Sequence, residues 1–326
     1  MPKPLMHETL KGQIYCFSGV VCWSFSEIIV WLLSGQDKTL GKVGSVTLTF
    51  YRFFFGGIVL LLLLAAMKDL SGMGEMLRKN KFLFFISSVI GLGFSNITYF
   101  IGIQMTEPHI GAALYTSYAL FIGIYSIFIL NERSNIPLKI TGFLMGLGGT
   151  ILLGVTSSMN SSKSGENPIL GNFLLVMSGA IWGFYSVLGK KIMRNNRGIK
   201  NVDVKFSALS FFLACIPPAI FLPFLPEGAS FINHSFVEWA LIGLMAVFVT
   251  AIGVYLFYHG CNTIDVSLGI SNSLLKPIFS AIFSFFLLGL DIPLAMFISI
   301  PIVSVAVLLI NKKPKQATIV KASDQE

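Results

Sequence analysis

Long apolar runs separated by short charged stretches leave this chain few ways to fold. Of its 326 residues, 54% are hydrophobic and only 12% are charged, about half the charged share of a soluble domain. Runs of about 20 apolar residues match the hydrocarbon thickness of a bilayer. Lipid cannot hydrogen-bond the backbone, so such runs must be helical there. The sequence therefore predicts an all-α membrane protein whose main partner is the lipid bilayer.

The hydropathy pattern predicts ten transmembrane helices joined by short loops. These helices are expected over residues 12–34, 45–67, 82–104, 108–130, 136–157, 169–190, 206–226, 237–260, 264–289 and 292–310. The first apolar segment is longer than the apolar region of a signal peptide, so we expect it to be retained. Residues 311–326 are expected to form a polar cytoplasmic tail.

The distribution of lysine and arginine gives the expected orientation. If the N-terminus is cytoplasmic, 18 basic loop residues lie inside, and three (Lys38, Lys42 and Lys163) lie outside. This excess is the positive-inside signal of membrane proteins. We therefore expect both termini to be cytoplasmic, in a plasma membrane or a prokaryotic inner membrane. The net charge of +8 then needs no nucleic-acid partner.

The two halves of the sequence resemble each other at an offset of 158 or 159 residues. The matching pairs are Gly12 with Gly171, Trp23 with Trp182, Gly102 with Gly260, Glu107 with Asp265, Gly111 with Gly269, Ala119 with Pro277, and Glu132 with Asp291. Five predicted helices fall in each half, over 12–157 and 169–310. Because five is odd, the second half is expected to enter the membrane inverted, as in many transporters whose substrate site lies at mid-membrane.

Several motifs also resemble the EamA-type family of the drug/metabolite transporter superfamily. The residues that carry the likeness are Trp23 and Trp182 in the first helix of each repeat, Arg52 in the second helix, the turn Leu130-Asn131-Glu132-Arg133 after the fourth, and Gly142 and Gly149 in the fifth. The resemblance covers about residues 12–310. It implies ten helices in two inverted repeats and the transport of small metabolites.

The sequence departs from this family pattern mainly in its second half. The fourth-helix proline is Ala119 in the first half and Pro277 in the second, the second turn reads Leu288-Gly289-Leu290-Asp291, and Pro293 and Pro301 replace spaced glycines. The family carries amino acids, nucleotide-type metabolites, polyamines and drugs on one scaffold, so the resemblance leaves the substrate open.

Lys276 is the most central ionisable residue, and such residues in a bilayer are costly and usually functional. It lies about halfway along the predicted helix 264–289, and Asn272 lies one turn earlier on the same face. Pro277 cannot donate to the helix ladder and is expected to free a backbone carbonyl. A substrate carboxylate or phosphate would suit this site. The alternative is a lysine that is neutralised by burial or paired within the protein.

Glu27 and Arg52 are predicted at a similar depth, about 10 Å below the outer surface. They could form an ion pair, which would give Arg52 a structural role. Alternatively, Glu27 takes up a proton or binds a substrate ammonium on a face shared with Trp23. Both interpretations stay open at this point.

Two histidines and several neutral polar side chains complete the predicted site. His259 suits a proton relay or a helix cap, and His109 is placed similarly at the outer end of helix 108–130. The remaining expected cavity residues are Asn96, Tyr99, Tyr115, Tyr118, Tyr185, Ser186 and Ser271. These could instead form interhelical hydrogen bonds. Pro277 and Glu132 are expected to be structural.

The sequence has no Walker loop, no metal-ligand cluster and no nucleophile elbow. Its cysteines, Cys16, Cys22, Cys215 and Cys261, fall in or at the ends of apolar runs and are expected to be small buried hydrophobes. We therefore expect no enzyme activity, no cofactor and no bound metal.

These features predict a secondary active transporter that works by alternating access. The expected substrate is a small zwitterion or anion such as an amino acid, with export as the expected direction and a proton as a candidate coupling ion. The alternatives are an antiporter for phosphorylated or nucleotide-linked metabolites, a cationic drug exporter and, from another class, a membrane enzyme or scaffold. Both a monomer and a homodimer fit the sequence.

Overall fold

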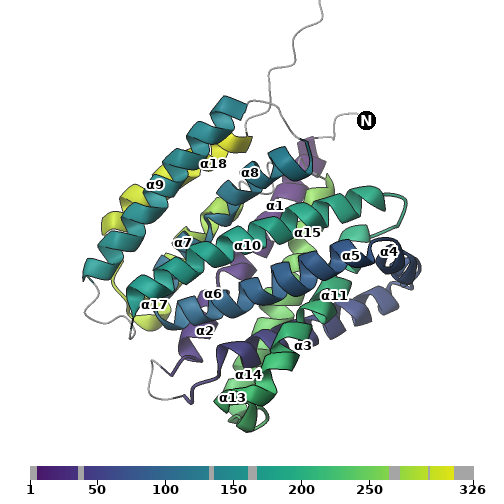
Figure 1. The fold of residues 1–326 in the computed structure, drawn as a ribbon, viewed down its shortest axis with the longest axis horizontal. Helices are drawn as coiled ribbons and strands as arrows, with labels where there is room; N and C mark the ends of the chain where they lie inside the picture. The colour runs from purple at the N-terminus through teal and green to yellow at the C-terminus, as the bar shows by residue number, and fades with distance from the viewer. Residues whose placement is uncertain are drawn as a thin grey trace, which may run out of the picture.

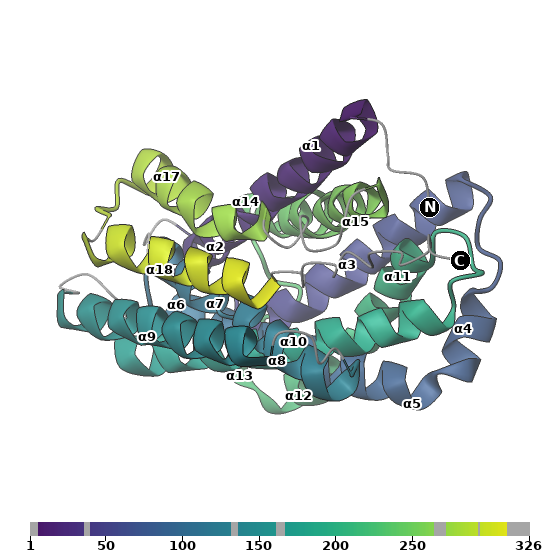
Figure 2. The same ribbon diagram turned by 90° about the horizontal axis from the view of Figure 1, so that it is seen from above.

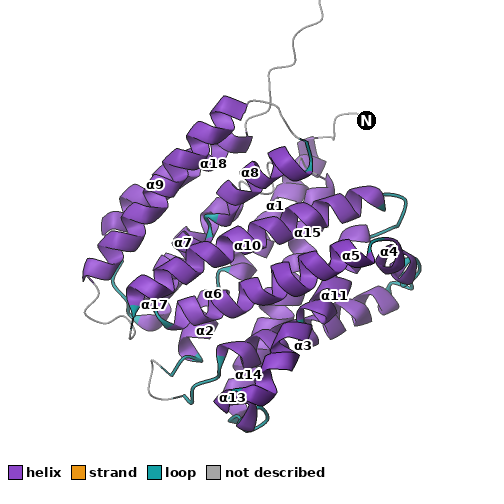
Figure 3. Cartoon of the chain, viewed as in Figure 1, coloured by secondary structure: helices purple, strands orange, loops and turns teal. Residues whose placement is uncertain are grey.

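The computed structural model describes residues 6–35, 40–131, 136–160, 167–263, 272–292 and 294–311, and the regular elements in these ranges are all helical (Figure 3). Eight helices in this part of the chain are long and apolar enough to cross a membrane. They are Leu10–Leu32, Ser45–Ala66, Lys81–Gln104, Pro108–Ile129, Ile136–Leu153, Pro168–Asn195, Val202–Phe224 and Phe236–Gly260. The chain is an integral multi-pass membrane protein.

The predicted count of ten is not confirmed. The ranges expected for the ninth and tenth spans contain two shorter apolar helices, Lys276–Leu288 and Leu294–Leu309. The start of the predicted ninth helix lies outside the described residues. The seventh span begins at Val202, four residues earlier than predicted, directly after Asn201 in the left-handed conformation (φ 46°).

Several spans are interrupted near their middle. The predicted continuous helix 12–34 is divided at Ser24 and Phe25 into α1 (Met6–Trp23) and α2 (Ser26–Leu32). The fourth span is divided at Thr116 and Ser117 into α7 (Pro108–Tyr115) and α8 (Tyr118–Ile129). The 3-10 turn η4 (Ser273–Leu275) leads into α17 (Lys276–Leu288). Interrupted helices of this kind present backbone and side-chain polar groups at mid-membrane depth.

Two other spans change to a π-helix in their middle. The third consists of α5 (Lys81–Phe84), η1 (Phe85–Gly93) and α6 (Phe94–Gln104). The eighth consists of α14 (Phe236–Leu244), η3 (Met245–Ile252) and α15 (Gly253–Thr263). Such π-helical turns are rare and often occur at functional sites.

The remaining elements complete the bundle (Figure 1). They are α3 (Ser45–Ala66), α4 (Met73–Lys79), α9 (Ile136–Asn160), α10 (Pro168–Asn195), α11 (Val202–Ala214), α12 (Ile216–Phe221), η2 (Leu222–Phe224), α13 (Pro226–Ala229) and α18 (Leu294–Asn311).

Most of the principal helix contacts join the first half of the chain to the second. The packed pairs are α1 with α15, α6 with α10, α3 with α11, α7 with α17, and α9 with α18. The pairs α1 with α15 and α9 with α18 lie side by side in both views (Figures 1 and 2). Glycine permits the closest approaches: a Cβ on Gly260 would lie 2.5 Å from the carbonyl oxygen of Gly12, and one on Gly102 would lie 3.0 Å from that of Gly171.

Candidate functional site

A buried ion pair lies where two interrupted spans meet. Lys276, the first residue of α17, places its Nζ 2.6 Å from Oε1 of Glu27 in the first turn of α2. Both side chains are almost fully buried. The Ser24 hydroxyl, at the break between α1 and α2, donates to the Lys276 carbonyl at 3.4 Å. Of the two alternatives left open for Glu27 and Arg52, the ion pair is not formed in this structure, because Lys276 occupies the position beside Glu27.

Tyrosines surround this ion pair. The Tyr99 hydroxyl donates to Glu27 Oε1 at 2.6 Å. The Lys276 ammonium lies 5.0 Å from the ring centroid of Tyr115 and 5.6 Å from that of Tyr99, within range of a cation–π attraction. The other carboxylate oxygen, Glu27 Oε2, is buried and has no hydrogen-bond partner. One acceptor at the centre of the site is therefore left available for a proton or another donor.

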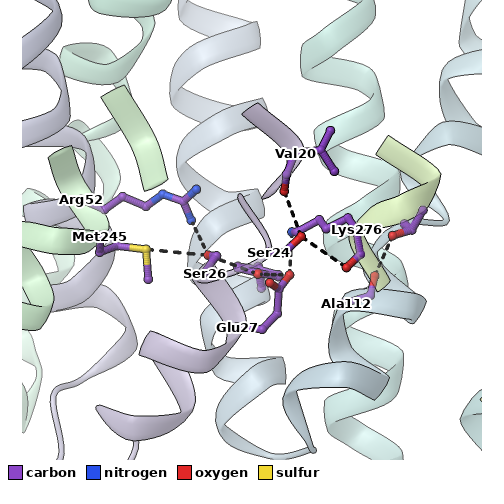
Figure 4. A network of polar contacts seen from close by, with 10 residues as sticks. Val20, Ser24, Ser26, Glu27, Arg52, Ala112, Met245 and Lys276 are labelled. Atoms are coloured by element: carbon purple, nitrogen blue, oxygen red, sulfur yellow. Dashed lines mark hydrogen bonds and ion pairs between the residues drawn. The ribbon is translucent and has the colours of Figure 1, made fainter. Parts of the chain in front are cut away.

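Within the described part of the chain, both hydrogen-bond partners of Arg52 on α3 are neutral. Its Nε donates to Thr250 Oγ1 at 3.0 Å, and its Nη1 donates to Ser26 Oγ at 3.4 Å. The guanidinium carbon lies 5.5 Å from the ring centroid of Phe100. Figure 4 shows Arg52, Ser26, Glu27 and Lys276 converging from different helices. The guanidinium is thus held in place by neutral groups, with no carboxylate of the described residues bonded to it.

A cavity of about 90 Å³ adjoins this cluster. Its walls come from both halves of the chain and are mainly aromatic. The lining residues are Trp23, Ser26, Arg52, Phe53, Leu92, Asn96, Tyr99, Tyr115, Tyr118, Trp182, Tyr185, Ser207, Phe211, Thr250, Val254, Phe257, Tyr258 and Lys276. An apolar wall with a few convergent polar groups is the usual form of a small-molecule site.

Aromatic side chains pack together near the start of α3. Tyr51 lies 4.7 Å from the Phe231 ring and 4.9 Å from the Trp239 ring, and its hydroxyl donates to the Phe231 carbonyl. Toward the other end, the lining continues to Ser207 near the start of its span and Tyr258 near the end of its own. The cavity therefore extends toward the end at which α11 begins.

Seven of the predicted substrate-binding residues line this cavity. They are Trp23, Asn96, Tyr99, Tyr115, Tyr118, Tyr185 and Lys276. Glu27 is not part of the lining, but its carboxylate contacts the lining residue Lys276. The sequence did not predict that Phe53, Trp182, Phe211, Phe257 and Tyr258 belong to the site, and Arg52 was expected to be structural. Aromatic residues in apolar runs carry no signal that separates a cavity wall from a packed core.

Other predicted site residues lie elsewhere. Ser186 is outside the lining and donates to the Trp182 carbonyl at 2.9 Å. Asn272 is also outside it, with its Nδ2 buried and without a partner. His259 packs against the rings of Tyr15 and Tyr255.

Two further predicted residues, His109 and Pro277, are described and lie outside the cavity lining. His109 is buried, and its Nε2 lies 3.3 Å from Glu107. Pro277 borders a separate small void beside α9 and α18. Glu132 and Ser271 lie outside the described residues. In the described ranges, no three His, Cys, Asp or Glu side chains are grouped as metal ligands would be.

Known proteins similar to this chain are transporters. "Uncharacterized transporter YetK" of Bacillus subtilis is 25% identical over 279 residues, covering 84% of this chain and 81% of that protein. "Aromatic amino acid exporter YddG" of Ancylobacter novellus is 23% identical over 260 residues, covering 79% and 85%. A solved crystal structure with a TM-score of 0.62 and 21% identity covers 91% of this chain and 94% of its own, and it shows a common fold.

The sequence profile of the EamA-like transporter family matches residues 10–155 and again residues 169–312. These two matches include nearly all of the described helices. The chain belongs to the EamA-like transporter family.

Proposed function

We propose that this protein is a secondary active transporter that moves a small carboxylate-bearing metabolite, with an amino acid of aromatic or apolar side chain as the first candidate. The observation that carries the proposal is the cluster of Glu27, Lys276 and Arg52 beside an aromatic cavity inside the bilayer. Ionisable groups are expensive in a membrane and mark substrate or proton pathways.

Alternating access needs two halves that can exchange roles, and the helix contacts support this arrangement. All five of the packed pairs, including α9 with α18, join one repeat to the other. The contact of Gly12 with Gly260 has its counterpart in that of Gly171 with Gly102, the residues matched by the sequence offset. The π-helices η1 and η3 fall at matching positions as well.

We therefore infer two inverted five-helix repeats, over 12–157 and 169–310, followed by the tail 311–326. In this interpretation the shorter helices α17 and α18 complete the ninth and tenth spans. The two repeats would tilt about the shared cavity, opening it to each side in turn.

The chemistry of the cavity favours a substrate with one carboxylate and an apolar body. The aromatic walls can pack against a ring or an aliphatic side chain. The YddG relative is named as an aromatic amino acid exporter, which agrees with this substrate class. A nucleotide-linked or phosphorylated substrate usually needs two or more available basic groups, and Lys276 is already paired with Glu27. Because this pairing leaves Lys276 unavailable to a second phosphate oxygen, the antiporter is less favoured than the amino acid transporter.

Export follows from combining the cavity with the charge distribution. Under the positive-inside rule, the end at which α11 begins is cytoplasmic. The lining extends toward that end, while Tyr51 packs against aromatic rings near the opposite end of the bundle. This conformation would accept substrate from the cytoplasm. Glu27, with one unpartnered carboxylate oxygen, is the residue that we assign to proton coupling.

Counterflow uptake into proteoliposomes tests the proposal. Vesicles containing the full chain are preloaded with unlabelled L-phenylalanine, and uptake of labelled L-phenylalanine is followed against empty liposomes. Saturable uptake that competes with other apolar amino acids, and not with uridine monophosphate or ethidium, is expected. Competition by ethidium alone would favour a drug exporter, and the absence of counterflow for every amino acid would refute the proposal.

A further inference from the structure

We propose that Arg52, rather than Lys276, is the residue that binds the substrate carboxylate. This inference rests on the proposed transport function and names the group that selects its substrate. It departs from the expectation drawn from the sequence, in which Lys276 was the anion-binding residue and Arg52 was structural.

The first argument is the charge balance at the cavity. Among the described lining residues, only Arg52 and Lys276 are basic, and none is acidic. Glu27 lies 2.6 Å from Lys276 and offsets its charge. Moving the shared proton from Lys276 to Glu27 does not alter the net charge of the pair, which is zero in both states. Among the described residues, one positive charge therefore remains at the cavity, and an uncompensated charge in a low-dielectric site is costly until an anion joins it.

The second argument is the availability of donors on the guanidinium. Arginine has five N–H donors, and Arg52 uses two of them, toward Thr250 and Ser26. The side chain is only partly buried and lines the cavity. A planar guanidinium with unused donors can bind a carboxylate through two parallel hydrogen bonds, a geometry that an ammonium cannot reproduce.

The third argument is that the guanidinium is already fixed in position. Thr250 Oγ1 donates to the Met245 carbonyl at 2.8 Å, so its lone pairs are directed toward Arg52. The rings of Phe53 and Phe100 lie 5.7 and 5.5 Å from the guanidinium carbon. A donor that is held in place before the ligand arrives loses little conformational freedom on binding, which favours affinity.

The body of the ligand would then lie along the aromatic walls. Trp182 and Tyr118 have ring centroids 4.6 Å apart, and Trp23 and Phe257 are likewise 4.6 Å apart. Both ring pairs border the same cavity as Arg52. The chemical class that fits is a monocarboxylate with an aromatic or branched aliphatic body. An α-amino group is tolerated by the tyrosine rings but is not the anchor.

Calorimetric titration of the full chain in detergent micelles tests this assignment with four probes. They are L-phenylalanine, 3-phenylpropanoate, its amide 3-phenylpropanamide, and phenethylamine. The wild type should bind the two carboxylates, and the amide and the amine should bind roughly 10- to 100-fold more weakly, the range for losing one charge-assisted hydrogen bond. This comparison needs no variant, so it does not depend on whether Arg52 can be replaced without unfolding.

Variants of Arg52 then test which residue binds the carboxylate. Arg52→Gln should weaken both carboxylates by the same roughly 10- to 100-fold, Arg52→Lys should recover part of the loss, and Arg78→Gln, at an exposed site, should change neither. A folded Arg52→Gln protein with wild-type affinity would overturn the role of Arg52 while leaving the transport proposal intact. Equal binding of the amide and the carboxylate would overturn it too. A wild type that binds none of the four probes would overturn both proposals.

Discussion

The ion pair between Glu27 and Lys276 makes a quantitative prediction about stability. Removing one partner of a buried pair leaves an uncompensated charge and costs about 3–5 kcal/mol. Both side chains are almost fully buried at a separation of 2.6 Å, so Glu27→Gln and Lys276→Met should each fall in this range. The double variant should lose much less than either single variant, because replacing a buried pair as a whole is often close to neutral.

Because each single variant loses about 3–5 kcal/mol and the double variant loses much less, the double-mutant cycle should give a coupling free energy of more than about 3 kcal/mol. Unfolding of the detergent-solubilised protein in a denaturing-detergent titration can be followed through the fluorescence of its four tryptophans. The pair of Lys79 with Glu75 is a matched control, since it has the same separation of 2.6 Å but is exposed to 66% and 61%. It should show no measurable coupling.

Additive losses in the Glu27 and Lys276 variants would refute this reasoning, since additivity means that the two groups do not interact. A double variant that is less stable than both single variants would refute it equally. Either result would remove the charge balance on which the role of Arg52 depends.

Four further predictions follow from the same structure. Gly19→Ala should destabilise the protein by about 1–3 kcal/mol, because the new Cβ would lie 2.8 Å from the Gly253 carbonyl oxygen and 2.9 Å from the Phe257 nitrogen. The control is Gly148→Ala, whose Cβ would meet nothing within 4 Å and which should be neutral or stabilising in the same unfolding titration. Tyr99→Phe removes a hydrogen bond to a buried carboxylate and should cost about 1.5–3 kcal/mol, while Tyr125→Phe, whose hydroxyl has no hydrogen bond within the described residues, should cost little. The pKa of the Asp69 carboxyl is held below its usual value, first by the hydrogen bond from Lys205 and also by that from Asn201. The stability that this carboxylate contributes to the folded protein is present above about pH 4 and is lost as the pH falls through the lowered pKa. Asp69→Asn should therefore lack this acid-dependent fall in melting temperature. The pH dependence of phenylalanine counterflow should disappear in Glu27→Gln and persist in His259→Gln, since His259 packs against aromatic rings outside the cavity. The opposite result would mean that His259, and not Glu27, is the proton-coupling residue.

The sequence predicted most of the membrane spans because each needs a long apolar run, and eight of these runs form helices of sufficient length. It also singled out Glu27 and Lys276, since charges are rare inside such runs. It did not predict which residues pair. Position along a helix gives depth, and Glu27 and Arg52 have similar depths, but depth alone does not show which side chains face each other across a bundle.

The sequence pattern also did not predict the helix breaks and π-helices at the site. The break at Ser24 and Phe25 has neither glycine nor proline to mark it, and the π-helix η1 continues an ordinary apolar run. The break before α17 is different, because Pro277 stands at its first turn and gives a visible signal. Lys205 was counted only as one of the basic loop residues, yet its Nζ lies 2.7 Å from Oδ1 of Asp69. Contacts between the halves of a chain are set by tertiary packing, which a single sequence does not display.

The most direct test of the central claim asks whether the aromatic cavity is the transport pathway. Val254 lines the cavity and is only partly buried, and Ile252, on the same span, is exposed and outside the lining. Phenylalanine counterflow is measured for Val254→Cys before and after treatment with a cysteine-modifying reagent, in a background without native cysteines and beside Ile252→Cys. We predict that modification abolishes counterflow in Val254→Cys, that phenylalanine slows this modification, and that Ile252→Cys stays active. Unchanged counterflow by a fully modified Val254→Cys protein would contradict the account.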